Sequence, residues 1–208
     1  RDAVRSSHSH FVKCSGLRWM SLMFLAPISW AGRVWALPFL TVLAPSERYC
    51  REAQKRHKKL TDWARQMALQ LRRWLPKRQI IVVADSSYAA LELLNAVRQY
   101  LCFIVRFRLD AALYDPPAEG KNRGRPRLKG KRQPTLAQRL NDPATEWQLL
   151  SVPTWYGLNN KPMLIASSTA LWYHVGKPPV PIRWVLIKDP EGKTQTTALL
   201  ATDLQLDA

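Results

Sequence analysis

The apolar positions of this chain form several short runs and one stripe with helical spacing. The most apolar part consists of two arms, residues 19–32 and 34–45, which Arg33 separates. Each arm is shorter than the roughly 20 residues that a membrane-spanning helix needs, and a charge at mid-membrane costs about 2.5–3.5 kcal/mol or more. Because the connection between the arms contains the Pro and Gly typical of turns, the pattern predicts two buried β-strands joined as a hairpin.

A basic amphipathic helix is predicted from Leu60 to just before Pro76. Its apolar stripe, with spacings of three and four, consists of Trp63, Ala64, Met67, Leu71, Trp74 and Leu75. Eleven Lys or Arg lie between Arg48 and Arg78 against two acidic residues. A solvated helix face, which is the alternative, usually mixes both signs of charge, so contact with phosphate groups is favoured. The candidate phosphate contacts are Lys58, Lys59, Arg65, Arg72 and Arg73.

An acidic residue ends the next apolar run. Residues 79–84 form a β-branched run typical of a strand buried on both faces, and Asp85 follows it directly. A helix with Ser86 or Ser87 as N-cap is predicted next, and residues 102–114 then alternate like a half-buried strand. Open α/β sheets bind ligands at such strand ends. The alternative is that Asp85 only caps the helix or satisfies loop amides.

A basic, linker-like segment follows at residues 116–134. Residues 121–132 contain seven Lys or Arg and no acid, and their centre, Arg-Gly-Arg-Pro-Arg at 123–127, resembles the core of a minor-groove AT-hook. Phosphate contact without sequence preference is slightly favoured, and both interpretations make DNA the partner. The candidate contacts are Arg123, Arg125, Arg127, Lys129, Lys131 and Arg132.

The rest of the chain is predicted to be mostly β. Four short apolar runs lie between turn residues, at 163–166, 170–174, 182–187 and 196–201. For each tryptophan in this part, core packing is favoured over stacking on a base. These tryptophans are Trp147, Trp155, Trp172 and Trp184.

Composition adds a partner class. The 208 residues are 47% hydrophobic, enough for one or two folded domains, and their formal net charge is +17. This charge predicts attraction to a polyanion, nucleic acid first and an anionic membrane surface second. The polar stretch at residues 1–16 lacks the apolar core of a signal peptide, so a cut fragment is favoured over a secreted protein.

Several kinds of chemistry lack their residues. The three cysteines show no CxxC spacing, which argues against a disulfide framework or a zinc site and favours a reducing compartment. His8 and His10 have no third metal ligand nearby in the sequence. The chain contains no Gly-rich phosphate loop, no Gly-x-Ser-x-Gly and no HExxH, which excludes nucleotide hydrolases, serine hydrolases and zinc proteases of those types.

Three stretches of the chain resemble a known family. The strings SHSHFVKCSGLRWMSLMFLAPISWAGRVWALPFLTVLAPSERY, RHKKLTDWARQMALQLRRWLP and IIVVADSSYAALELL are similar to the catalytic domain of bacterial insertion-sequence transposases of the DDE type. The resemblance covers essentially the whole chain. It implies an α/β fold: an RNase H-like mixed sheet with flanking helices at residues 1–114, its first strand missing, then a basic loop and a mostly β insertion at residues 115–208.

The resemblance also implies a catalytic role for Asp85. It corresponds to the second catalytic Asp of the family and to a metal ligand. Asp2 lies in a polar loop, so the first Asp is expected upstream of Arg1, and the catalytic Glu is expected beyond Ala208. Glu146 and Glu191 lie in loop or turn sequences and are poor substitutes. The fragment is therefore expected to hold one of three metal ligands.

The function implied is DNA transposition: metal-dependent DNA cleavage and strand transfer at transposon ends. The cofactor implied is Mg²⁺ or Mn²⁺, as two ions about 3.5–4 Å apart, which a single carboxylate cannot hold, so the fragment is expected to be inactive. The implied partners are double-stranded DNA and a second copy in a synaptic homodimer, with no membrane, in the bacterial cytoplasm at the nucleoid. The alternative is a non-catalytic DNA-binding relic or accessory protein.

Overall fold

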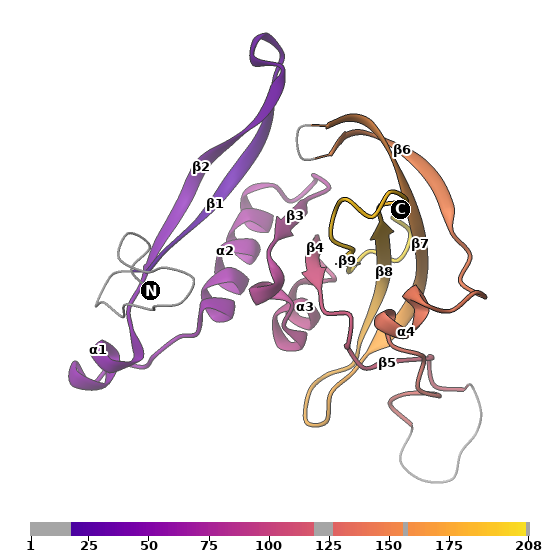
Figure 1. The fold of residues 1–208 in the computed structure, drawn as a ribbon. Helices are drawn as coiled ribbons and strands as arrows, with labels where there is room; N and C mark the ends of the chain where they lie inside the picture. Colours follow the sequence, from indigo (N-terminus) through magenta and orange to yellow (C-terminus); the bar gives the residue numbers. More distant parts are fainter. Residues whose placement is uncertain (1–17, 119–126, 156–157, 207–208) are drawn as a thin grey trace, which may run out of the picture. The chain divides into compact units, whose positions relative to one another are not determined.

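A computed structural model describes residues 18–118, 127–155 and 158–206 (Figure 1). The chain divides into two compact units, one ending at Met67 and the other starting at Ala68, and the division falls inside the helix α2 (Leu60–Trp74). Within the described residues, none of the helices has the length and apolar character that a membrane span requires.

The first unit contains the predicted hairpin. Strands β1 (Arg18–Ile28) and β2 (Arg33–Ala44) pair antiparallel, joined by the 3-10 turn η1 (Ser29–Ala31). Gly32 ends this turn with φ +61°, a left-handed conformation that glycine adopts without steric cost. The hairpin is followed by the short helix α1 (Glu47–Glu52), whose first turn Ser46 caps by accepting a hydrogen bond from the Tyr49 amide.

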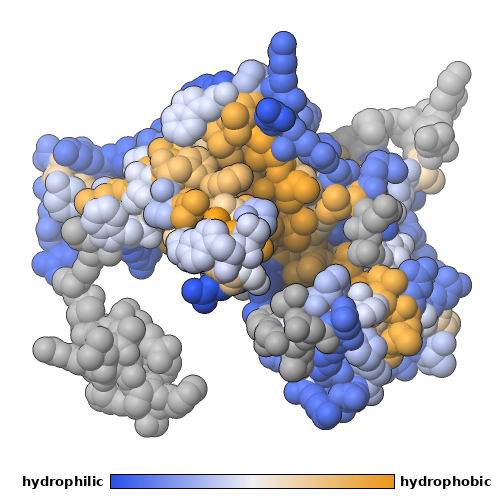
Figure 2. Space-filling view, turned by 90° about the horizontal axis from the view of Figure 1, so that it is seen from above, coloured by the Kyte–Doolittle hydropathy of each residue, from blue (hydrophilic) through white to orange (hydrophobic). Residues whose placement is uncertain are grey.

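The prediction that the two hairpin strands are buried is wrong. Trp19, Phe24 and Trp30 are 70%, 62% and 80% exposed. Figure 2 shows one face of the molecule, on which hydrophobic residues in orange lie exposed beside hydrophilic residues in blue. Paired residues alternate between the two faces, and both faces carry large apolar side chains. Two strands alone cannot cover either face, so the apolar pattern exceeds what this sheet buries.

The second unit is built on one mixed sheet, which gives the chain a mixed α/β fold. The strands follow the order β3-β4-β9-β8-β7-β5, and β6 also pairs with β7. Among the described strands of this sheet, only β3 and β4 pair in parallel, and the other pairs are antiparallel. The strand bounds are β3 (Ile81–Ala84), β4 (Cys102–Phe107), β5 (Leu113–Tyr114), β6 (Gln148–Trp155), β7 (Leu158–Trp172), β8 (Val180–Lys188) and β9 (Thr197–Ala201).

One face of this sheet forms the core. Val105, Leu200 and Trp184 lie side by side across β4, β9 and β8, and each is at most 2% exposed. Helix α3 (Leu91–Val97) contacts β8, and its residues Leu91, Leu93, Leu94 and Val97 are buried. Helix α4 (Leu136–Leu140) starts with a capping box between Thr135 and Gln138.

The sheet differs from the sequence-based expectation in three respects. Strand β3 is not buried on both faces, since Ile81 and Val83 are 46% and 63% exposed and β3 pairs only with β4 among the described residues. Ser167 and Ser168, expected to form a turn between the apolar runs 163–166 and 170–174, lie inside β7. The two runs therefore belong to one strand. The sheet also crosses the boundary expected at residue 114, because β4 pairs with β9.

A buried ion pair joins β7 to the turn after β8. The ammonium of Lys161 lies 2.5 Å from Oδ2 of Asp189, and the two residues are 7% and 2% exposed. Asp189 also accepts hydrogen bonds from the amides of Glu191 and Thr194. The hydrogen bond from Lys161 is the main cause that lowers the pKa of Asp189 from 3.8 to about 2, against the opposing effect of burial. The ionised carboxylate therefore favours the folded state.

We expect Asp189→Asn to lower the thermal unfolding midpoint at neutral pH, because it leaves the buried Lys161 without its counter-charge. Since the pKa of Asp189 is lowered on folding, its contribution to stability is fully present above about pH 4 and is lost as the pH falls through about 2. Thermal unfolding followed by circular dichroism between pH 7 and pH 2 should show the gap between the two proteins closing in acid. A gap independent of pH would contradict this role.

Candidate functional site

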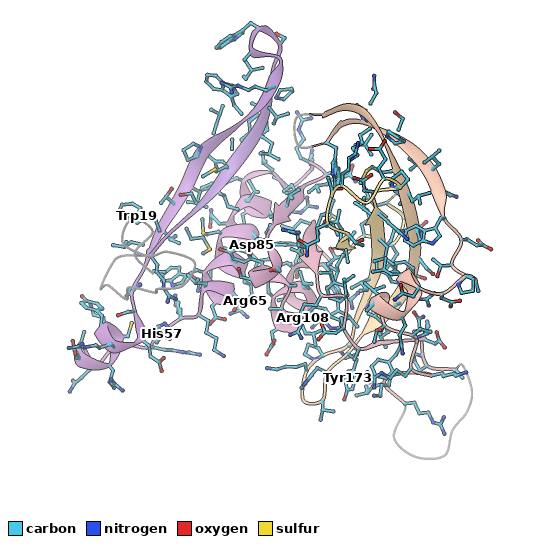
Figure 3. The ribbon with its side chains drawn as sticks, viewed as in Figure 1. Trp19, His57, Arg65, Asp85, Arg108 and Tyr173 are labelled. Carbon is cyan, nitrogen blue, oxygen red and sulfur yellow. The ribbon has the colours of Figure 1, made fainter. Side chains whose placement is uncertain are left out.

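The parallel pairing of β3 and β4 places the carboxyl ends of two strands at one edge of the sheet. The register pairs Ala84 with Val105, and Asp85 follows Ala84 at the point where β3 ends. Asp85 is exposed to solvent there (Figure 3). The sequence-based placement of Asp85 at a strand end before helical structure is therefore what the structure shows.

The carboxylate of Asp85 is held by Ser87. Its Oδ1 accepts hydrogen bonds from the Ser87 amide at 2.8 Å and from the Ser87 hydroxyl at 2.5 Å. Asp85 is thereby the N-cap of the 3-10 turn η2 (Ser86–Tyr88), while α3 begins later, after Ala90. The expectation that Ser86 or Ser87 is the cap is thus wrong, and the alternative that Asp85 acts as a cap is confirmed: Ser87 donates and Asp85 accepts.

Capping does not use the whole carboxylate. Oδ2 of Asp85 has no hydrogen-bond or ion-pair partner among the residues that the structure describes. Burial, and secondly the negative charge of Asp85, raise the pKa of Tyr88, so this phenol stays neutral at physiological pH. The arrangement leaves one fixed carboxylate oxygen directed away from its cap.

The described residues do not complete a metal site around Asp85. They contain no group of three or more His, Cys, Asp or Glu side chains that could bind a metal ion together. Asp110 is paired with Arg108, and Glu191 is paired with Lys193 in the turn after β8. Asp2, His8 and His10 lie outside the described residues. Asp85 therefore supplies one suitable oxygen, fewer than Mg²⁺ requires.

Helix α2 and the two residues before it hold the first group of candidate phosphate contacts, and in this group Lys58 and Arg72 each have two partners. The Lys58 ammonium lies 4.6 Å from the ring centroid of Trp63 and 3.3 Å from the Gln66 side-chain oxygen. A guanidinium nitrogen of Arg72 donates to the carbonyl of Arg78 at 2.7 Å and to that of Leu75 at 3.4 Å. Arg72 thus caps the carboxyl end of the helix.

The other three cations of this group are more accessible. Arg73 donates only to Gln70 at 3.2 Å, and Arg65 lies 3.9 Å from Asp62, a distance at which an exposed pair stabilises little. The Lys59 side chain is exposed and has no partner within the described part of the chain. The exposed cations Lys59, Arg65 and Arg73 therefore fit phosphate contact better than Lys58 and Arg72.

The basic loop after β5 contains the second group. Arg127, Lys131 and Arg132 are exposed, and none of the three has an ion pair with a described residue. Lys129 differs, because its ammonium lies over the rings of Tyr114 and Tyr173. Arg123 and Arg125, and with them most of the AT-hook-like sequence, lie outside the described residues.

Of the tryptophans after residue 134, Trp172 and Trp184 pack against other side chains. Trp184 is 2% exposed, and the Arg139 guanidinium lies 5.0 Å from its ring centroid. Trp172 packs edge-on against Phe107, with ring centroids 5.0 Å apart. The half-buried Trp147 has Lys188 within 5.9 Å of its ring. Core packing, favoured from the sequence, is confirmed for Trp184.

A mixed α/β domain with a solvent-facing aspartate at the end of a parallel strand, and with cations on one helix and one loop, has the features of a nucleic-acid-processing enzyme. Residues 3–177 match the family model for the DDE superfamily endonucleases, so the chain belongs to this family. The family implies a nuclease that acts on DNA with divalent metal ions. No curated protein and no solved structure matches the chain significantly.

Sequence reasoning missed two features of the site. The first is the role of Ser87: capping by Asp85 was one of the two interpretations of the sequence, but Ser87 was expected to be a cap and not the donor that orients Asp85. The partners of Lys129 were not predictable, because Tyr114 and Tyr173 are 59 positions apart in the sequence and meet only through the pairing of β5 with β7.

The two neighbouring arginines of α2 form a matched pair for a test. We expect Arg72→Gln to destabilise the protein by about 1 kcal/mol, because it removes the hydrogen bonds to the Leu75 and Arg78 carbonyls. This corresponds to a thermal midpoint lower by about 2–4 °C. Arg73→Gln should leave the midpoint unchanged and weaken DNA binding. Thermal unfolding and DNA titration of both variants measure these effects. Equal effects of the two substitutions on stability and binding, or effects in the reverse order, would contradict the assignment.

Proposed function

We propose that this chain is part of a DNA transposase, which cleaves DNA and transfers strands at the ends of a bacterial insertion sequence. The observation that carries the proposal is the position of Asp85 at the carboxyl end of β3, with one carboxylate oxygen that has no partner among the described residues. The family match over residues 3–177 supports an endonuclease of the DDE superfamily. Strand transfer and the bacterial origin rest on the resemblance of the sequence to insertion-sequence transposases.

In this proposal Asp85 is the second catalytic Asp and binds metal through Oδ2. The hydrogen bonds from Ser87 to Oδ1 fix the side-chain rotamer, so that Oδ2 is presented without further ordering. Bound Mg²⁺ or Mn²⁺ would activate the attacking hydroxyl and stabilise the leaving oxygen. Since one carboxylate cannot hold such ions tightly, we propose that the two remaining carboxylates lie outside this chain and that the chain alone does not cleave DNA.

The proposed DNA contacts are the accessible cations of the two basic groups. On α2 and directly before it these are Lys59, Arg65 and Arg73, and on the loop they are Arg127, Lys131 and Arg132. Exposed cations can each displace a condensed counterion from DNA, which is the main source of affinity without sequence preference. We further propose that two copies act together, since strand transfer joins two transposon ends.

A second candidate function is DNA binding without catalysis. The lack of a carboxylate cluster around Asp85 in the described residues favours it. Both candidates use the same cations, so DNA binding alone does not separate them. They differ in whether Asp85 is needed for cleavage when the full set of carboxylates is present.

Duplex binding should be dominated by phosphate contacts. We expect the logarithm of the association constant to fall linearly with the logarithm of the salt concentration, by about 0.9 for each phosphate contacted. Six contacts would reduce the affinity about a thousandfold between 50 and 200 mM salt. Fluorescence anisotropy of a labelled duplex measures this slope. A flat salt response would exclude DNA as the partner of the basic residues.

Substitution of Asp85 separates the two candidate functions. We expect Asp85→Asn to leave the DNA affinity of this chain within about twofold, and to abolish cleavage in a protein that has all three carboxylates, because the amide cannot replace an anionic metal ligand. Asp110→Asn is the control, since Asp110 is exposed and already paired with Arg108. Cleavage assays with Mg²⁺ and anisotropy would refute the ligand role if Asp85→Asn lost binding in proportion to cleavage, or if both variants cleaved equally.

A further inference from the structure

Lys129 occupies an aromatic clamp at the base of the basic loop. Its ammonium lies 3.8 Å from the ring centroid of Tyr114 and 4.9 Å from that of Tyr173. The two rings are edge to face with centroids 6.1 Å apart, and Tyr173 lies near β5 (Figure 3). Lys129 is half-buried, whereas its neighbours Arg127 and Lys131 are exposed. The ammonium of Lys129 therefore already interacts with two aromatic rings of the protein itself.

Backbone hydrogen bonds join the two arms of the basic loop. The outgoing arm is residues 113–116, and the returning arm is residues 127–133. The Gly130 amide donates to the Asp115 carbonyl, and the Asp115 amide donates to the Lys131 carbonyl, both at 2.8 Å. The Gln133 amide donates to the Leu113 carbonyl at 2.9 Å. A Cβ atom at Gly130 would lie 2.4 Å from the Pro116 carbonyl oxygen, so only glycine permits this close approach.

A side-chain relay continues from the loop base to the sheet. The Gln133 amide group donates to Asp115 at 2.8 Å, and its oxygen accepts from Arg139 at 3.3 Å. Arg139 in turn lies over the buried Trp184. The direction of the returning arm is therefore set by contacts that extend into the core.

We infer that Lys129 is a positioning residue for DNA binding and does not contact DNA itself. Held by Tyr114 and Tyr173, it fixes the returning arm so that Arg127, Lys131 and Arg132 present their charges to the phosphate backbone. A cation that already lies against two rings gains little from a phosphate, whereas a preformed arm loses less conformational freedom on binding. This inference rests on the proposed DNA-binding function and assigns different roles to neighbouring basic residues.

The test compares variants of the whole chain on one labelled duplex across a salt series. Tyr173→Leu leaves every charge in place, yet it should weaken binding about two- to fivefold, because it removes one wall of the clamp. Lys129→Gln should weaken binding similarly, and the double variant should lose no more than either single variant. Tyr173→Phe keeps the ring and should bind normally. Lys131→Gln, the matched control for a direct contact, should reduce the salt slope by about 0.9.

A second readout does not depend on DNA. Trypsin should cleave after Lys131 and Arg132 faster in Tyr173→Leu than in Tyr173→Phe at equal global stability, because the loosened arm opens more often. Normal DNA binding by Tyr173→Leu, with a reduced salt slope for Lys129→Gln, would show that Lys129 contacts phosphate and would overturn the inference. Absence of salt-dependent binding by the unsubstituted chain would overturn the proposed function as well, and the two failures are thus distinct.

Discussion

The parallel pairing of β3 with β4 is the constraint on which the candidate site depends. Parallel neighbours need a crossover connection, and η2 and α3 provide it, which turns the chain sharply at Asp85. On its other side β4 pairs with β9, and the link continues beyond the ladder, where Phe103 and Thr202 exchange two hydrogen bonds. The edge that presents Asp85 is thereby fixed by contacts with residues about a hundred positions later in the sequence.

Strands β1, β2 and β3 are more exposed to solvent than their apolar sequences predict. Continuous β-branched runs such as residues 79–84 are typical of strands with apolar cover on both faces. Yet β3 exposes Ile81 and Val83, and β1 and β2 expose large side chains on both faces. Large exposed apolar patches mark interaction surfaces or aggregation-prone surfaces. In each unit, therefore, the sheet carries more apolar side chains than the described residues of that unit cover.

Local patterns predicted local structure well and long-range structure poorly. The helical stripe from Leu60 corresponds to α2, because periodicity follows from the geometry of a single element, and the alternation predicted for residues 102–114 corresponds to β4 only as far as Phe107. The position of Asp85 at a strand end was predictable for the same reason. The pairing of β4 with β9, the continuity of β7 through its two serines, and the clamp around Lys129 depend on tertiary contacts, which no sequence window contains.

The structure separates the basic residues into two groups, those with partners inside the fold and those exposed to solvent. Some cations are consumed by the fold: Lys161 pairs with Asp189, Arg72 caps a helix, and Arg183 bonds the Leu204 carbonyl and the Ser167 hydroxyl. Others are exposed and have no described partner, including Arg127, Lys131 and Arg132. A net charge of +17 counts both kinds equally, so it overstates the number of phosphate contacts. In the proposed function, the affinity for DNA comes from the exposed subset and not from the net charge of the whole chain.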